Sequence, residues 1–306
     1  MEHRLKPFEL SDRLDEAAFA FRGYNQTNLG RTPELLAHRA YGRVVERYLR
    51  EASEIYSEFS GRSVDLVARV REKRESSLET FGEDIGLIIS VELAQIELLE
   101  QFFDISYRHA RIGMGYSLGE VTALISGGVF NMRDVLTPLL AMAEDSAELA
   151  RDVTMGIVFS RGRALDFEAV ERLCLEITTQ RRGMIAISSY LSPNTVLVLG
   201  QGDTVDRLKT RLAEVLREPV HVRKNNGAWP PLHTPLLWLR TIPNRAALMM
   251  HSIGGGFRAP TPPVLSLVTG KASYNDFNSR AILNHWIDQP QRLWDGIYEL
   301  LAMGIR

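Results

Sequence analysis

The spacing of apolar and polar residues along the chain predicts a mixture of helices and strands. An apolar run at 17–21 stops at Gly23, which is typical of a buried strand that enters a tight loop. Residues 33–59 carry apolar side chains at helical spacing, and residues 84–103 are apolar on most sides, which predicts a helix buried in the core. The charged run 69–75 predicts a solvated helix face or an exposed loop.

A strand, a sharp turn and a helix follow in direct succession. Residues 109–114 predict a short strand, and residues 121–125 have a helical pattern. The turn between them, residues 115–120, reads Gly-Tyr-Ser-Leu-Gly-Glu. Two glycines in such a turn allow neighbouring backbone segments to approach it closely. This order of elements places one serine at the end of a strand and the start of a helix.

A second pattern begins near residue 154 and predicts the element order β-α-β-β-α-β up to residue 224, which is the ferredoxin-like split arrangement. We therefore predict a small inserted subdomain, residues 154–224, in a larger α/β body formed by residues 1–153 and 225–306. The rest of the body is predicted to contain a Pro-rich loop at 229–231, a helix ending near residue 252, a strand at 264–268 and a helix at 291–303.

Composition and charge narrow the class of protein. With 36 basic and 38 acidic side chains among 306 residues, the net charge of −2 disfavours a nucleic-acid partner. No apolar stretch approaches the ~20 residues that span a bilayer, so no membrane partner is expected. Cys174 is the only cysteine, which excludes an internal disulfide and a cysteine zinc cluster. We expect a cytoplasmic protein that uses no metal and no cofactor.

The pattern Gly115-x-Ser117-x-Gly119 has the form of a nucleophile elbow. A hydroxyl nucleophile has to stand clear of the strand end, and a strained turn between strand and helix presents it in this way. The helix that begins there also directs backbone N–H groups toward a developing oxyanion. Ser117 is therefore the candidate nucleophile.

A serine nucleophile needs a base, and histidine is the usual one. Among the seven histidines, His233 stands in a loop that prolines fix on both sides, Pro231 and Pro235, just before a predicted helix. Rigid loops at the ends of elements commonly present catalytic groups. On these local grounds His233 is the first candidate for the base and His285 the second.

The segment 113–129 resembles the active-site segment of malonyl-CoA:acyl carrier protein transacylases, which reads Gly-His-Ser-Leu-Gly-Glu and continues with Thr-Ala-Leu and a small-residue stretch. Other stretches are similar and stand in the family's order: 19–23, 188–200, 232–236, 268–271 and 290–304. The resemblance implies an α/β-hydrolase-like large subdomain with an inserted ferredoxin-like small subdomain, in agreement with the pattern analysis.

The resemblance implies a ping-pong acyl transfer. Ser117 would attack an acyl-CoA thioester while His233 takes its proton, and the acyl group would then pass to the phosphopantetheine thiol of an acyl carrier protein. The backbone amides of Leu118 and Tyr24 would bind the oxyanion, and the backbone carbonyl of Trp286 would orient the histidine.

The chain also departs from the family at two positions of the implied acyl pocket. Tyr116 replaces the histidine before the nucleophile, and Met142 stands where the family has an arginine that binds the free carboxylate of malonyl. Either another cation serves, with Arg133 and Arg161 as candidates, or the acyl group is an apolar monocarboxylic one, which a thioether would suit.

Two further functions remain open at this stage. The same serine and histidine could hydrolyse acyl groups from acyl carrier proteins, since a pocket without the arginine need not retain malonyl. The chain could also be a non-catalytic docking module for a carrier protein, because Tyr24, Tyr116 and Met142 all differ from the family's pattern.

Overall fold

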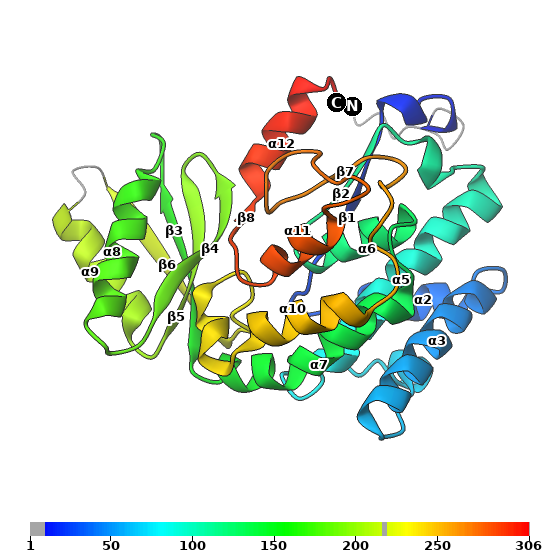
Figure 1. The fold of residues 1–306 in the computed structure, drawn as a ribbon, viewed down its shortest axis with the longest axis horizontal. Coiled ribbons are helices and arrows are strands. Elements are labelled where there is room, and N and C mark those ends of the chain that lie inside the picture. Colours follow the sequence, from blue (N-terminus) through cyan, green and yellow to red (C-terminus); the bar gives the residue numbers. More distant parts are fainter. Residues whose placement is uncertain (1–9, 216–218, 306) are drawn as a thin grey trace.

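The computed structural model describes residues 10–215 and 219–305 and consists of a helical body beside a smaller sheet-and-helix part (Figure 1). The body surrounds a parallel three-stranded sheet with the order β1-β2-β7. Its strands are β1 (Ala18–Phe21), β2 (Ile112–Gly115) and β7 (Val264–Leu265). The apolar run at 17–21 thus forms the predicted strand, whereas the strand predicted at 264–268 is only two residues long.

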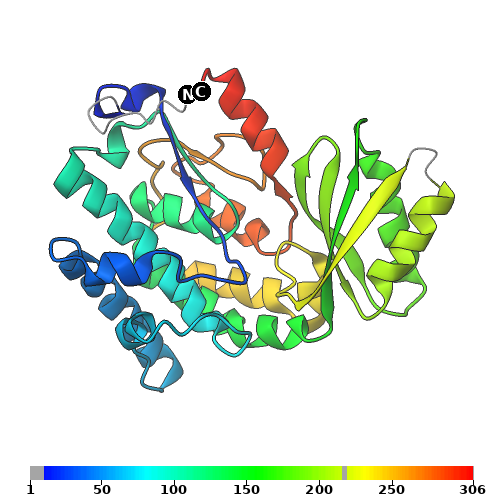
Figure 2. The same ribbon diagram turned by 180° about the vertical axis from the view of Figure 1, so that it is seen from behind.

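Long helices form the main core next to this sheet (Figure 2). The predicted buried helix is confirmed as α5 (Phe81–Phe103), which packs between α3 (Gly42–Ser60), α7 (Met132–Ala150) and α6 (Leu118–Ser126). The predicted helix at 33–59 is instead two helices, because the chain turns between α2 (Thr32–Ala37) and α3. The remaining body elements before the second sheet are η1 (Leu14–Glu16), α4 (Leu66–Arg71) and η2 (Tyr107–His109).

The second sheet has five strands in the order β6-β3-β5-β4-β8. Its elements in chain order are β3 (Val153–Ser160), α8 (Phe167–Thr179), β4 (Ile185–Ser192), β5 (Thr195–Gln201), α9 (Thr204–Val215), β6 (Val220–Ala228) and β8 (Gln291–Arg292). The first four strands pair antiparallel, and α8 and α9 cover one face of the sheet (Figure 1). This arrangement is consistent with the predicted ferredoxin-like insertion, whose boundaries, 154–224, stay a prediction.

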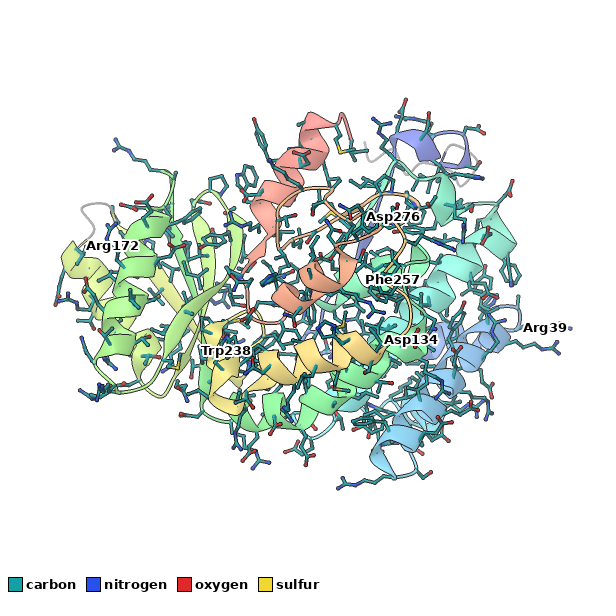
Figure 3. All side chains as sticks on the ribbon, in the orientation of Figure 1. Arg39, Asp134, Arg172, Trp238, Phe257 and Asp276 are labelled. Atoms are coloured by element: carbon teal, nitrogen blue, oxygen red, sulfur yellow. The ribbon has the colours of Figure 1, made fainter. Side chains whose placement is uncertain are left out.

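The C-terminal part of the body returns to this sheet. It contains η3 (Pro235–Arg240), α10 (Ile242–Ser252), α11 (Ser279–Trp286) and α12 (Leu293–Ala302). The helix predicted at 291–303 therefore begins two residues later, because Gln291 and Arg292 pair with β4 as a parallel strand. Trp238 of η3 lies where the body meets the second sheet, and Arg39 and Arg172 lie near opposite ends of the molecule (Figure 3).

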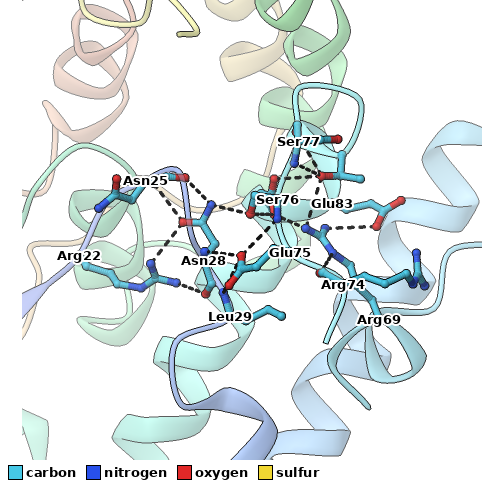
Figure 4. Close-up of polar contacts among 12 residues, drawn as sticks. Arg22, Asn25, Asn28, Leu29, Arg69, Arg74, Glu75, Ser76, Ser77 and Glu83 are labelled. Atoms are coloured by element: carbon cyan, nitrogen blue, oxygen red, sulfur yellow. Dashed lines mark hydrogen bonds and ion pairs between the residues drawn. The ribbon is translucent and has the colours of Figure 1, made fainter. Parts of the chain in front are cut away.

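The prediction that the charged run 69–75 is solvated is wrong for Arg69. Its side chain is fully buried, and its guanidinium contacts the buried carboxylate of Asp84 at 2.5 Å and that of Glu83 at 3.2 Å. A polar cluster extends from this pair through Ser76 to Asn28 (Figure 4). The charged run 69–75 therefore does not face solvent along its whole length, because part of it holds the loop after β1 in place.

Candidate active site

The turn between β2 and α6 has the strained backbone of a nucleophile elbow. Ser117 has φ 53° and ψ −119°, a conformation that a non-glycine residue rarely adopts. A Cβ atom on Gly115 would lie 1.9 Å from the carbonyl carbon of Gly119, and one on Gly119 would lie 2.4 Å from the carbonyl oxygen of Phe21. Both glycines are therefore required by the close approach of the backbone, as the sequence predicts.

The structure brings Ser117 and His233 together. The serine Oγ lies 2.7 Å from His233 Nε2, and His233 Nδ1 lies 2.6 Å from the backbone carbonyl oxygen of Trp286. Because a carbonyl oxygen only accepts, Nδ1 carries the hydrogen and Nε2 is left to accept the serine proton. His285, the second candidate base, is exposed on α11 away from this contact.

Burial lowers the pKa of His233 to about 4, while the hydrogen bond to the Trp286 carbonyl acts in the opposite direction. The imidazole is therefore neutral at physiological pH, which is the form that accepts a proton. Its loop is held from both sides: the His233 N–H donates to the Ile287 carbonyl at 2.7 Å, and Ser188 Oγ donates to the Leu232 carbonyl at 3.1 Å.

The side chains of Trp286 and Gln291 hold the backbone of Ser117 in place. The indole N–H of Trp286 donates to the carbonyl oxygen of Ser117 at 3.0 Å, and the N–H of Ser117 donates to Gln291 Oε1 at 3.2 Å. Gln291 is not among the site residues predicted from the sequence, because the sequence pattern assigns it to the final helix. Both contacts restrain the elbow beyond what the two glycines do.

The positions of Tyr24 and Leu118 agree with an oxyanion site. Both residues line the cavity next to Ser117. Within the described part of the chain, the backbone N–H groups of Tyr24 and Leu118 have no hydrogen-bond acceptor. Leu118 also begins α6, where the helix macrodipole favours negative charge. Two unused donors of this kind can bind a developing oxyanion.

A narrow inner cavity of about 30 Å³ lies beside Ser117. It is lined by Tyr24, Phe81, Ile85, Ser117, Leu118, Leu139, Met142, Ala143, Ser146, Leu232, Ile242, Trp286 and Ile287. None of these lining residues carries a charge. Met142 lies in the wall of this cavity next to the serine, and its role in an acyl pocket stays a prediction. The volume corresponds to roughly two water molecules, so a short group fits without rearrangement.

A wider outer cleft of about 420 Å³ also opens beside Ser117 and His233, lined from the second sheet by Met155, Ser188 and Leu197. Tyr116 lines this outer cleft and not the inner cavity, so the structure separates it from Met142. The cleft lies where the body and the smaller sheet meet. It therefore gives a longer molecule access to the serine from solvent.

The two arginines considered as substitutes for the missing cation lie elsewhere. Arg133 is exposed near the start of α7 and pairs with Glu58. Arg161 lines a separate cavity at the far end of β3, with Pro219 and His221. Neither lines the inner cavity.

Two kinds of feature are absent from residues 10–215 and 219–305, the part of the chain that the structure describes. No group of three or more His, Cys, Asp or Glu side chains there could hold a metal ion. No helix there is long and apolar enough to cross a bilayer.

Comparison with known proteins shows that this α/β architecture is shared with solved structures. No family model matches the chain, and no curated protein matches its sequence. Solved structures do match, among them FabD of Acinetobacter baumannii, with a TM-score of 0.74 and 18% identity over 96% of this chain and 86% of that one. The malonyl-CoA:acyl carrier protein transacylase of Xanthomonas oryzae matches with a TM-score of 0.70 and 24% identity over 94% and 84%.

A malonyl-transacylase solved in complex with a type II polyketide synthase acyl-carrier protein matches with a TM-score of 0.72 and 20% identity over 94% of this chain and 86% of that one. The chain therefore has the fold of the malonyl-CoA:acyl carrier protein transacylases. This similarity of fold confirms the predicted α/β fold class and the resemblance inferred from residues 113–129.

Proposed function

We propose that the protein transfers an acyl group from acyl-CoA to an acyl carrier protein through an acyl-Ser117 intermediate. The observation that carries this proposal is the chain of contacts from Ser117 Oγ to His233 and from His233 to the Trp286 carbonyl, at 2.7 and 2.6 Å. The unused N–H groups of Tyr24 and Leu118 beside the same serine add the donors that acyl transfer requires.

In the first half-reaction, Ser117 Oγ attacks the thioester carbonyl carbon and His233 Nε2 takes the hydroxyl proton. The negative charge on the carbonyl oxygen is stabilised by the backbone N–H groups of Tyr24 and Leu118. The carbon–sulfur bond then breaks, and the leaving thiolate of CoA takes the proton from His233. In the second half-reaction the phosphopantetheine thiol gives its proton to His233 and attacks the acyl ester, and Ser117 recovers the proton.

We further propose that the acyl group is short and uncharged rather than malonyl. Malonyl would place its carboxylate in a cavity whose lining is uncharged. The sequence resemblance implies that Met142 of this lining stands where the family has its arginine. Burying a carboxylate without a cation or hydrogen bonds costs several kcal/mol. A flexible thioether instead packs against a short apolar chain.

The assembled site argues against a non-catalytic docking module. A module without catalysis would not need Ser117 in a strained conformation or a neutral histidine aligned with it. Hydrolysis of acyl groups from acyl carrier proteins would use the same acyl-serine intermediate and differ only in the acceptor, which is water. It needs no different site, so the experiment below has to distinguish it from transfer.

The test is intact-protein mass spectrometry after brief mixing with acetyl-, propionyl- and malonyl-CoA, with Ser117→Ala as the control. We expect acetyl or propionyl adducts on the wild-type protein only, and malonyl adducts at least about 100-fold slower, since an unpaired buried charge costs roughly 3 kcal/mol. The acyl-enzyme is then offered a carrier-protein thiol in buffer. Discharge to the thiol supports transfer, faster discharge to water supports hydrolysis, and the lack of any adduct overturns the proposal.

A further inference from the structure

Glu92 is a buried carboxylate on α5 in a mostly apolar stretch. Its side chain is 6% exposed, and each oxygen accepts one hydrogen bond. Oε1 accepts from the backbone N–H of Arg22 at 2.7 Å, and Oε2 accepts from the hydroxyl of Thr122 on α6 at 2.7 Å. Glu92 therefore connects α5, on which it lies, with α6, which follows Ser117, and with the loop after β1.

That loop carries a proposed oxyanion donor only two residues further on, the N–H of Tyr24. Between them, Gly23 is pressed against the elbow: a Cβ atom there would lie 2.6 Å from the Tyr116 carbonyl oxygen and 3.1 Å from Ser117 Cβ. The position of the Arg22 amide thus determines how the loop meets the nucleophile. Glu92 is the group that accepts from this amide.

The far side of the loop is fixed by other contacts (Figure 4). The Arg22 guanidinium donates to the Asn28 carbonyl at 2.5 Å and to Asn28 Oδ1 at 3.2 Å. Asn28 in turn donates to Ser76 at 2.8 Å and to Glu75 at 2.9 Å. The guanidinium is therefore committed to Asn28 and forms no ion pair with Glu92, whose carboxylate relies on its two hydrogen bonds.

The environment of Glu92 raises its pKa to about 7, chiefly through burial. The facing groups that oppose this rise are the Thr122 hydroxyl from α6 and the amide and positive charge of Arg22 from the loop. They do not restore the ordinary value of 4.5. The carboxyl group therefore changes charge in the neutral range while it is bonded to the loop.

We propose that Glu92 is a positioning residue that holds the oxyanion loop against Ser117 through the Arg22 amide and so supports acylation of this serine. This inference rests on the proposed function. The ionised carboxylate accepts a charge-assisted hydrogen bond from Arg22, which is about twice as strong as a neutral one. Protonation weakens that bond, so acylation accelerates as the pH rises.

His233 does not produce the same effect. Its pKa of about 4 leaves the imidazole neutral throughout the neutral range. A rise in rate near pH 7 therefore reports on another group. Glu120 is the matched control, because burial raises its pKa to about 7 as well, but its carboxylate accepts from the Leu267 N–H at 3.0 Å and the Tyr274 hydroxyl at 2.6 Å instead of the loop.

The experiment measures Ser117 acylation by rapid-quench mass spectrometry between about pH 5.5 and 8.5 in the wild type, Glu92→Gln and Glu120→Gln. We expect the wild-type rate to rise about five- to tenfold with a midpoint near pH 7. The rise should be absent in Glu92→Gln and retained in Glu120→Gln. A rise that persists unchanged in Glu92→Gln overturns the inference.

Thr122→Val provides a second variant that keeps the carboxylate in place. Loss of the Thr122 hydroxyl removes a hydrogen bond that favours the ionised form, so the midpoint should move to higher pH by about half a unit or more. A merely structural role would lower the rate without moving the midpoint, and an unmoved midpoint therefore also counts against the inference.

Hydrogen exchange of the backbone amides at 19–25 separates this inference from the proposed function, because it needs no acyl donor. Protection of the Arg22 amide, corrected for the intrinsic exchange rate, should fall several-fold in Glu92→Gln and as the wild type is taken from pH 8 to pH 6. If no donor acylates Ser117 but this pattern is found, the proposed function fails and the coupling of Glu92 to the loop stands. Equal protection in both proteins rejects the coupling.

Discussion

Trp286 contacts both proposed catalytic residues, Ser117 and His233, with different atoms. Its backbone carbonyl accepts from His233 Nδ1, and its indole N–H donates to the carbonyl oxygen of Ser117. The rings of Trp286 and His233 also meet edge to face, with centroids 4.9 Å apart. A single buried residue thus restrains the distance between Ser117 and His233, which the proposed acyl transfer requires to within a fraction of an ångström.

The residue whose change should alter specificity is Met142. Met142→Arg would introduce a cation beside Ser117 in a cavity that otherwise has an uncharged lining, so the ratio of malonyl to acetyl acylation rates should rise by about tenfold or more. Met142→Ala is the control, because it enlarges the cavity without adding charge. Competition between the two donors, read by mass spectrometry, measures the ratio. An equal gain in both variants would attribute the effect to space rather than charge.

At the scale of elements, α4 and α5 are joined by the buried pair of Arg69 and Asp84. Both side chains are 0% exposed, and burial raises the pKa of Asp84 despite the adjacent guanidinium. Arg69→Met leaves the carboxylate buried without its cation, so the free energy of unfolding should fall by about 3 kcal/mol. Urea denaturation followed by circular dichroism measures this loss.

Two further variants make the prediction for the Arg69–Asp84 pair specific. The double variant Arg69→Met, Asp84→Leu removes both charges and should recover part of the stability lost in the single variant. Arg71, in the same helix, is exposed and pairs with Glu46, so Arg71→Met should change the free energy of unfolding by less than about 0.5 kcal/mol. Equal losses for Arg69 and Arg71 would contradict a special role of the buried pair.

Sequence periodicity predicts those parts of the fold that depend on neighbouring residues. It predicts the buried helix α5, the strand–turn–helix around Ser117 and the β-α-β-β-α-β order, because each is encoded in a local pattern. It does not predict the burial of Arg69, whose partner Asp84 is 15 positions away. A charged run has the same pattern whether or not one of its members points inward.

The same limit applies to the site. The structure brings Ser117 and His233 together, and their catalytic roles stay a proposal. Gln291 could not be found, because its contact with Ser117 joins residues 174 positions apart and its strand with β4 is two residues long. Glu92 did leave a signal. It is the single charged residue of the apolar stretch 85–96, and such a residue has to be buried with hydrogen-bond partners, although the sequence does not name them.

At the scale of the whole molecule, the shifted pKa values of three buried groups, Glu92, Glu120 and His233, contribute to the dependence of stability on pH. The pKa values of Glu92 and Glu120 are raised from 4.5 to about 7, so between these limits the folded state binds protons that the unfolded state has released. Their contribution to stability is complete below about pH 4.5 and is lost as the pH rises through 7. His233, with its pKa lowered from 6.5 to about 4, acts in the opposite direction and adds stability as the pH rises between those values.

The two carboxylates outnumber the histidine, so the free energy of unfolding should be higher at pH 5 than at pH 7.5, by about 2–4 kcal/mol at about 1.4 kcal/mol per titrating group and pH unit. Glu120→Gln removes one of the two groups and should reduce this difference by roughly half or more. Urea unfolding at several pH values measures both quantities, and stability that is constant or rises from pH 5 to 7.5 would contradict the assignment. Because the proposed role of Glu92 requires its ionised form, the protein should acylate fastest where these carboxylates stabilise it least. A buried charge that positions an oxyanion loop therefore has a stability cost that the remaining core has to offset.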